Sequence, residues 1–278
     1  MKIKRNQTSS ACSGACLLKK IAKESGGKIV IASAKPDNAR PANARPANAK
    51  PAIEPVESDW GHNVSIMPCA ETQGSAMGAI DTLPLDRTNI FGVCIHHTDT
   101  ETADKARKTL KSKNYSTHFL IDKNGDTTVE LPLCKRAAAC VGFNKWMWQI
   151  DVVGRLHINE PTDPQLLALE NLLVLLACGR NVVTIDKKFA SKCRALGTEE
   201  VQKEASKRYT ETYNKYHERA VKKKSWYGVL DKLPFTIFYH GEVRPTACCG
   251  KNLINKLPLI ISNVSARLNG EDNERVPF

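Results

Sequence analysis

Apolar and polar residues are arranged in short segments that predict a mixed α/β domain beginning at about residue 89. The run 90–95 is apolar, β-branched and too short for a helix, so it predicts a buried strand. This run ends in two polar residues, His96 and His97. A helical pattern follows over about 101–112. The first buried strand therefore delivers two histidines at its end.

The next segments predict a β-hairpin. Strand patterns occupy 116–122 and 127–131, and the turn between them contains Asn124-Gly125. An Asn-Gly pair between two apolar runs is a strong hairpin signal.

The second half of the domain predicts two more strands and a core helix. Residues 149–156 and 235–239 have strand patterns, and the later one ends in His240. Between them, Asp163-Pro164 predicts the start of a helix that ends near Gly179. One face of that helix carries Leu166, Leu169, Leu172, Leu173 and Leu176. The order of elements predicts a mixed central sheet flanked by helices.

Before the domain, the chain has a basic head and a repetitive linker. A five-residue unit, Asn-Ala-Arg/Lys-Pro-Ala, occurs three times within 38–52. A proline in every unit without large apolar side chains predicts an extended linker. We therefore expect a largely disordered segment at 1–58, a globular domain at 59–262 and a C-terminal tail at 263–278.

A basic segment interrupts the domain at about 185–230. Residues 187–224 contain twelve Lys and Arg against five Glu, a balance of +7, with Tyr209, Tyr213 and Tyr216 at roughly helical spacing. We predict a helical insertion that the sheet does not need. It could contact an anionic polymer, or it could be a solvated helical face.

The composition of the chain leads to two expectations, one about its partner and one about its cellular compartment. The 278 residues carry a formal net charge of +12, which favours a polyanionic partner. The ten cysteines are scattered, several within apolar runs, so we expect free thiols in a reducing cytosol. We find no secretory signal pattern and no membrane span. Synthesis in the cytoplasm is therefore expected, with action on a cell wall only after release by another route.

Three residues at strand ends and in the loop after the last strand could bind a metal. His96 and His240 each follow a predicted strand, and Cys248 lies eight residues after His240. A catalytic zinc site uses three nitrogen, sulfur or oxygen ligands and one open position. Each residue alone is more often structural, so their combination carries the prediction.

Four segments around these residues resemble the zinc N-acetylmuramoyl-L-alanine amidases. This family includes phage lysozyme-type amidases, cytoplasmic anhydro-muropeptide amidases and peptidoglycan recognition proteins. The resemblance runs from about residue 90 to 253, apart from the insertion. Its segments are Val-Cys-Ile-His-His-Thr at 93–98, Tyr-Ser-Thr-His-Phe-Leu-Ile-Asp at 115–122, residues 138–154, and His-Gly-Glu-Val-Arg-Pro-Thr-Ala-Cys at 240–248.

The resemblance implies a zinc-dependent hydrolase that cleaves the amide bond between N-acetylmuramic acid and L-alanine in peptidoglycan. It selects His96, His240 and Cys248 as Zn²⁺ ligands, and Asp151 as the acid/base, where some members have glutamate. An ion-paired structural aspartate is the alternative for Asp151. Thr246 is implied to stabilise the developing oxyanion, with a turn-stabilising role as its alternative.

The resemblance also implies substrate contacts by His97, Thr117, Cys140 and Asn144. Cys140 stands where many members have a histidine, and Thr117 stands where some members have the catalytic tyrosine. The departures at Cys140 and Asp151 leave open a second function, an amidase-fold module that binds peptidoglycan, muropeptides or a protein without cleavage. Nucleic acid is not an expected partner, because only charge supports it.

Overall fold

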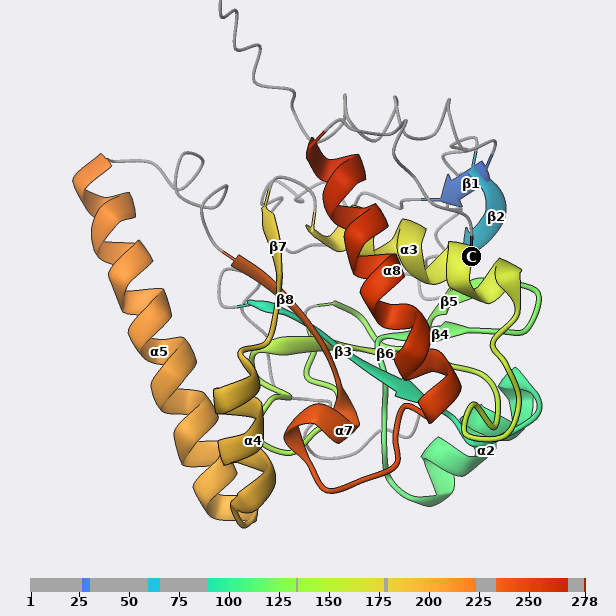
Figure 1. Ribbon diagram of the computed structural model, residues 1–278, viewed down its shortest axis with the longest axis horizontal. Helices are drawn as coiled ribbons and strands as arrows, with labels where there is room; N and C mark the ends of the chain where they lie inside the picture. The colour runs from blue at the N-terminus through green and yellow to red at the C-terminus, as the bar shows by residue number, and fades with distance from the viewer. Residues whose placement is uncertain are drawn as a thin grey trace, which may run out of the picture.

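The computed structural model describes residues 27–30, 60–65, 90–133, 135–177, 180–223, 234–269 and 278 (Figure 1). The predicted repeat linker at 38–52 lies outside these residues. A short strand, β1 (Gly27–Val30), lies within the segment predicted to be disordered.

The centre of the fold is a mixed sheet, as predicted. Its strand order is β1-β2-β5-β4-β6-β3-β8-β7. Among the strand pairs that the structure describes, β4 and β5 alone are antiparallel, and they form the predicted hairpin. After β1, the strands are β2 (Trp60–Ser65), β3 (Gly92–His97), β4 (Phe119–Ile121), β5 (Thr127–Val129), β6 (Met147–Val152), β7 (Asn181–Thr184) and β8 (Pro234–Tyr239).

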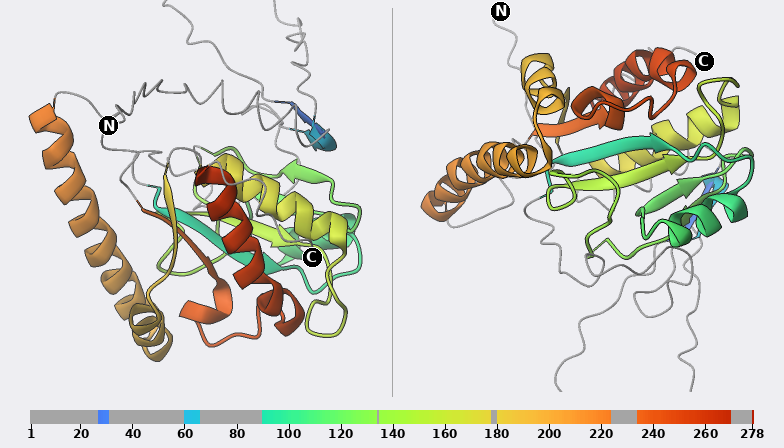
Figure 2. Two further views of the ribbon diagram at one scale, coloured as in Figure 1. Left: turned by 45° about the horizontal axis from the view of Figure 1, so that its top comes forward. Right: turned by 90° about the horizontal axis from the view of Figure 1, so that it is seen from below.

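Helices cover both faces of the sheet. Figure 2 shows α3 and α8 on one face and α2 on the other. The helices are α2 (Ala103–Ser112), α3 (Asp163–Ala177), α4 (Lys187–Ala195), α5 (Thr198–Lys223), α7 (His240–Val243) and α8 (Lys251–Asn269). None of these described helices is long and apolar enough to cross a lipid bilayer.

The main hydrophobic core fills the space between the sheet and the pair α3 and α8. It contains the predicted leucine face of α3, with Leu166, Leu169 and Leu173 almost completely buried. The helix begins with Thr162 as its cap. The Gln165 backbone N–H donates to Thr162 Oγ1, and the Thr162 backbone N–H donates to Gln165 Oε1. This capping box makes Thr162 the N-cap, and the predicted Asp163 is the first helical residue.

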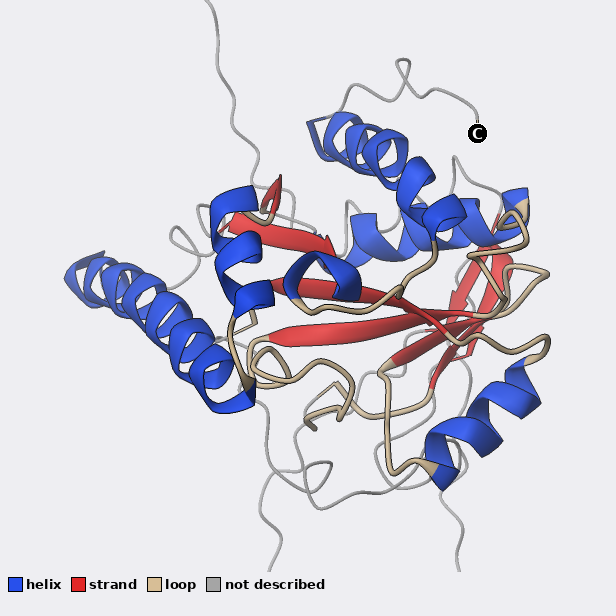
Figure 3. Cartoon of the chain, turned by 60° about the horizontal axis from the view of Figure 1, so that its bottom comes forward, coloured by secondary structure: helices blue, strands red, loops and turns tan. Residues whose placement is uncertain are grey.

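A second core makes the basic insertion part of the fold. Helices α4 and α5 pack beside the β7 end of the sheet, and α5 extends away from it (Figure 3). Tyr209 is 4% exposed, and its ring lies 5.1 Å from Phe91 and 5.9 Å from Trp146. Tyr213 and Tyr216 pack against the same cluster. The tyrosines therefore face the core, so the helical insertion packs against the domain although it adds no strand to the sheet.

One other strand and one helix end differ from the prediction. Strand β7 was not predicted, because it has only four residues and its side chains are mostly exposed at the sheet edge. Helix α8 continues beyond residue 262, where the sequence predicted a tail, and it buries Asn263 and Val264. Pro258 lies inside α8, and a proline ordinarily indicates the end of a helix.

Candidate metal centre

Two neighbouring parallel strands bring the first two predicted ligands together. Ile95 of β3 is the register partner of Tyr239 of β8. The residue after each of them is a histidine, His96 on β3 and His240 at the start of α7, so the two emerge side by side at the carboxyl edge of the sheet. Their ring centroids are 4.8 Å apart.

A tight turn brings Cys248 back to the same edge. The Gly241 backbone N–H donates to the Cys248 carbonyl over 2.6 Å. A Cβ atom at residue 241 would overlap that carbonyl and the carbonyl of Thr246, so glycine is required for this close approach. The turn also places Cys248 Sγ 3.4 Å from the backbone nitrogen of His97, which donates to it.

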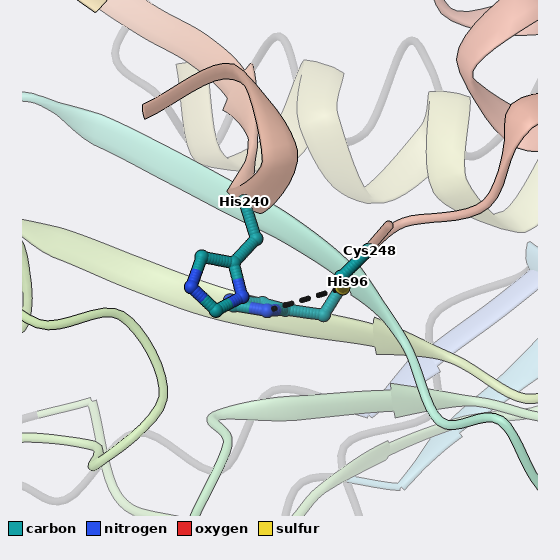
Figure 4. Close-up of side chains that lie close together, drawn as sticks. All are labelled: His96, His240 and Cys248. Carbon is teal, nitrogen blue, oxygen red and sulfur yellow. Dashed lines mark hydrogen bonds between the residues drawn. The ribbon is translucent and has the colours of Figure 1, made fainter. Parts of the chain in front are cut away.

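The three side chains form one compact group (Figure 4). Their potential ligand atoms all lie within 4.8 Å of one another, and His96 Nδ1 is 3.7 Å from Cys248 Sγ. Among the residues that the structure describes, no other group of three histidine, cysteine or carboxylate side chains meets in this way. Two nitrogens and one sulfur form a donor set that suits a soft or borderline divalent metal.

Burial shifts the pKa values of His240 and Cys248 in the metal-free chain. Burial, together with smaller contributions from the nearby His96 and Arg244, lowers the pKa of His240 to about 3. Neutral imidazole is the form that binds metals. Burial raises the pKa of the Cys248 thiol, against the opposing effect of the His97 backbone N–H. Metal binding would therefore have to displace a proton from Cys248.

A hydrogen bond on the far side of the ring holds His96. Its Nε2 lies 2.9 Å from Oε1 of Gln149, which is completely buried on β6. The sequence analysis did not select Gln149. The available signal was its position two residues before Asp151, because alternate residues of a strand share a face.

Asp151 is the direct register partner of His96 on the neighbouring strand β6. Only 5% of each residue is exposed. Burial raises the pKa of the Asp151 carboxyl above its ordinary value, whereas His96 and the Thr117 hydroxyl act in the opposite direction. A buried carboxyl with a raised pKa has the character of a general acid or base.

The hydroxyl groups of Thr117 and Thr246 both form hydrogen bonds with the backbone. Thr117 is completely buried, and its hydroxyl lies 3.0 Å from the Gln149 carbonyl and 3.2 Å from the Phe119 carbonyl. Thr246 is exposed, and its hydroxyl oxygen accepts from the Cys248 backbone N–H over 3.3 Å. This bond fits a turn-stabilising role, and the hydroxyl proton is still available to a ligand.

Three predicted substrate contacts lie in other surroundings. The His97 ring accepts from the Leu156 backbone N–H and contacts the His157 ring. Cys140 is completely buried in the second core. Asn144 Oδ1 accepts from the backbone N–H of Cys140 over 2.8 Å. The side chains of His97, Cys140 and Asn144 therefore make structural contacts, and their contact with a substrate stays a prediction.

Helix α4 supports the helix that carries His240. Arg194 of α4 donates to the Gly241 carbonyl, and Arg244 at the end of α7 donates to the Leu196 carbonyl over 3.0 Å. These two bonds join α4 and α7. The insertion thus contributes to the surroundings of the metal centre.

Several solved structures are similar to this chain. N-acetylmuramoyl-L-alanine amidase LysC from Clostridium intestinale is 18% identical, with a TM-score of 0.38, over 70% of this chain and 96% of that one. Drosophila peptidoglycan recognition protein SA is 16% identical, with a TM-score of 0.41, over 71% and 91%. The Ph2119 endolysin from a Thermus scotoductus bacteriophage is 15% identical, with a TM-score of 0.37, over 65% and 88%.

The family assignment rests on the sequence. A comparison with curated proteins finds no match. Residues 86–223, however, match the model of the N-acetylmuramoyl-L-alanine amidase family. This range includes His96 and Asp151 and ends before His240 and Cys248. The chain belongs to the N-acetylmuramoyl-L-alanine amidase family.

Proposed function

We propose that this chain is a zinc-dependent peptidoglycan amidase that hydrolyses the amide between N-acetylmuramic acid and L-alanine. The observation that carries the proposal is the convergence of His96, His240 and Cys248 at one edge of the sheet. Membership of the amidase family indicates the class of reaction, and the three side chains are the candidate ligands for the zinc ion.

The donor set fits zinc. Ligand atoms held tetrahedrally at about 2.0–2.3 Å from zinc lie about 3.3–3.8 Å apart. The 3.7 Å between His96 Nδ1 and Cys248 Sγ falls in this range, and the upper limit of 4.8 Å for the group requires a shift of only about 1 Å. When bound, zinc supplies Lewis acidity, which lowers the pKa of water and polarises a carbonyl.

Asp151 is the residue that we expect to move the proton. Hydrolysis forms a bond between water oxygen and the amide carbon and breaks the carbon–nitrogen bond. Asp151 accepts a proton from water and returns it to the nitrogen of L-alanine, which leaves as a free amine. Its raised pKa favours the protonated form relative to an ordinary aspartate, which suits the second transfer.

Thr246 is the candidate for stabilising the charge that develops on the carbonyl oxygen. Its hydroxyl oxygen accepts from the Cys248 backbone N–H, which leaves its proton available to another acceptor. Its exposure leaves that proton within reach of a substrate.

Analysis of the products of digested peptidoglycan tests the proposal. Purified sacculi incubated with the zinc-loaded chain should gain new N-terminal alanine, detected by amine labelling and mass spectrometry. His240→Ala should release none, and His157→Ala should serve as a matched histidine control that retains activity.

A second function, binding without cleavage, is favoured by two features. Asp151 is one methylene shorter than the glutamate of some relatives, and Cys140 is buried where many relatives have a cleft histidine. If this function is correct, the zinc-loaded chain should sediment with sacculi and release no N-terminal alanine.

A further inference from the structure

We propose that Gln149 is a positioning residue that fixes the tautomer of His96, so that Nδ1 is the nitrogen presented to the metal. The inference rests on the proposed zinc site. It concerns a residue that lies outside the ligand set and makes no contact with the reacting atoms.

The register of two strands brings Gln149 to His96. On β3 and β6, Cys94 pairs with Gln149, and His96 pairs with Asp151. Gln149 and His96 are therefore diagonal neighbours on one face of the sheet. Gln149 is completely buried and His96 is 5% exposed, so solvent does not compete for their 2.9 Å hydrogen bond.

A second hydrogen bond fixes the orientation of the Gln149 amide. Its Nε2 donates to the backbone carbonyl of Met147 over 3.1 Å. The amide nitrogen can donate to this carbonyl and the amide oxygen cannot, so Oε1 is the atom that faces His96. Since Oε1 can only accept, His96 Nε2 must carry the proton.

The proton on Nε2 determines what the other nitrogen can do. In a neutral imidazole, the nitrogen without a proton is the one that offers its lone pair. That nitrogen is Nδ1, which lies 3.7 Å from Cys248 Sγ. Two successive hydrogen bonds, from the Gln149 amide to the Met147 carbonyl and from the His96 ring to the Gln149 amide, thus direct the lone pair of Nδ1 into the metal centre.

Gln149 is itself held from both sides of its backbone. Its N–H donates to Nδ1 of His118 over 2.9 Å, and its carbonyl accepts from the Thr117 hydroxyl and the His118 backbone N–H. These bonds limit the movement of the residue. A fixed acceptor is what a metal-binding histidine requires on its distal nitrogen.

The experiment compares two substitutions of Gln149. Gln149→Glu keeps an acceptor at the same place, whereas Gln149→Met keeps the shape and removes it. Zinc affinity, measured by competition with a chromophoric chelator, should fall about 10–100-fold in Gln149→Met and much less in Gln149→Glu. Gln165→Met is the matched control, because Gln165 is also buried and bonds a backbone carbonyl, that of Val153, away from the site.

A spectroscopic readout in the metal-free chain separates positioning from simple stability. Nitrogen-15 NMR of the histidines should find His96 protonated at Nε2 in the natural chain and in Gln149→Glu. Gln149→Met should contain a mixture of tautomers.

Two results would overturn the inference. One is a natural chain with the His96 proton on Nδ1, which needs no variant to observe. The other is Gln149→Met with unchanged zinc affinity and unchanged tautomer. Failure of the natural chain to bind zinc would instead overturn the proposed function, and the tautomer measurement would still decide the role of Gln149.

Discussion

His96 on β3 and Asp151 on β6 are direct partners in the register of two parallel strands, and both are buried at the carboxyl edge of the sheet. The pairing places the candidate proton carrier next to a candidate ligand. Asp151 is also close enough to Cys248 for its negative charge to raise the pKa of the thiol.

The first prediction concerns the rate of hydrolysis. Asp151→Asn should retain zinc and lose about 10²–10⁴-fold in turnover, the usual contribution of general acid–base catalysis. Turnover is measured as the release of N-terminal alanine, and zinc by elemental analysis of the same sample. An unchanged rate would remove Asp151 from the mechanism and favour either Tyr115, which is 53% exposed, as the proton carrier or the function of binding without cleavage.

The second prediction is a pH dependence of stability in the metal-free chain. Burial raises the pKa of Asp151 in the folded state above its ordinary value of 3.8. The folded state therefore favours the protonated acid, and this contribution to stability is lost as pH rises through the folded-state pKa. Asn mimics the protonated acid, so the stability gained by Asp151→Asn over the natural chain should increase with pH.

Urea unfolding of both chains in a chelator, repeated at several pH values from below 3.8 to neutral, measures this difference. A gain that decreases with rising pH would contradict the assigned direction. A constant difference would mean that Asp151 has the same pKa in the folded and unfolded chains.

The third prediction tests whether the insertion belongs to the core. Tyr209→Ala should destabilise the chain by about 3–5 kcal/mol, as expected for an aromatic side chain removed from a core. Tyr209→Phe should not destabilise it, because the buried hydroxyl has no hydrogen-bond partner within the described part of the chain. Urea unfolding compares the two, and equal stability of Tyr209→Ala and the natural chain would show that α5 is peripheral.

The fourth prediction concerns the surface of the insertion. Lys203, Lys207 and Lys215 are exposed on α5. Their replacement by glutamate should weaken cosedimentation with anionic sacculi in 0.05 M salt and have little effect at 1 M, where the Debye length is about 3 Å.

The matched control places the same charge change on α2, at the exposed residues Lys105, Lys108 and Lys111. If both triple variants lose binding equally, net charge rather than the insertion attracts the polymer. Substitution is preferable to deletion of the insertion, because deletion would expose the second core and remove the Arg194 contact with α7.

The sequence predicted those parts of the fold that depend on local patterns. The strand before His96, the Asn124-Gly125 hairpin and the leucine face of α3 each have a periodicity or a turn signal of their own. The proximity of His240 and Cys248 could also be predicted, because a single short segment joins them.

The missed features depend on contacts between distant segments. Gln149 meets His96 only through the register of β3 and β6, which no local pattern specifies. The tyrosines of α5 have helical spacing, but the sequence does not say that Phe91 and Trp146 receive them. Cys140 was assigned as a substrate contact from the family resemblance alone. Its burial depends on how the 138–146 loop packs against α5.

Zinc titration of the metal-free chain, followed by release of N-terminal alanine from peptidoglycan, tests the central claim most directly. Activity should rise from zero and level off at one equivalent of zinc. Cys248→Ser should lose this response, and the neighbouring Cys249→Ser, whose side chain lies in the main core, should retain it. Activity that is independent of zinc, or a chain that binds one zinc and releases no alanine, would contradict the account.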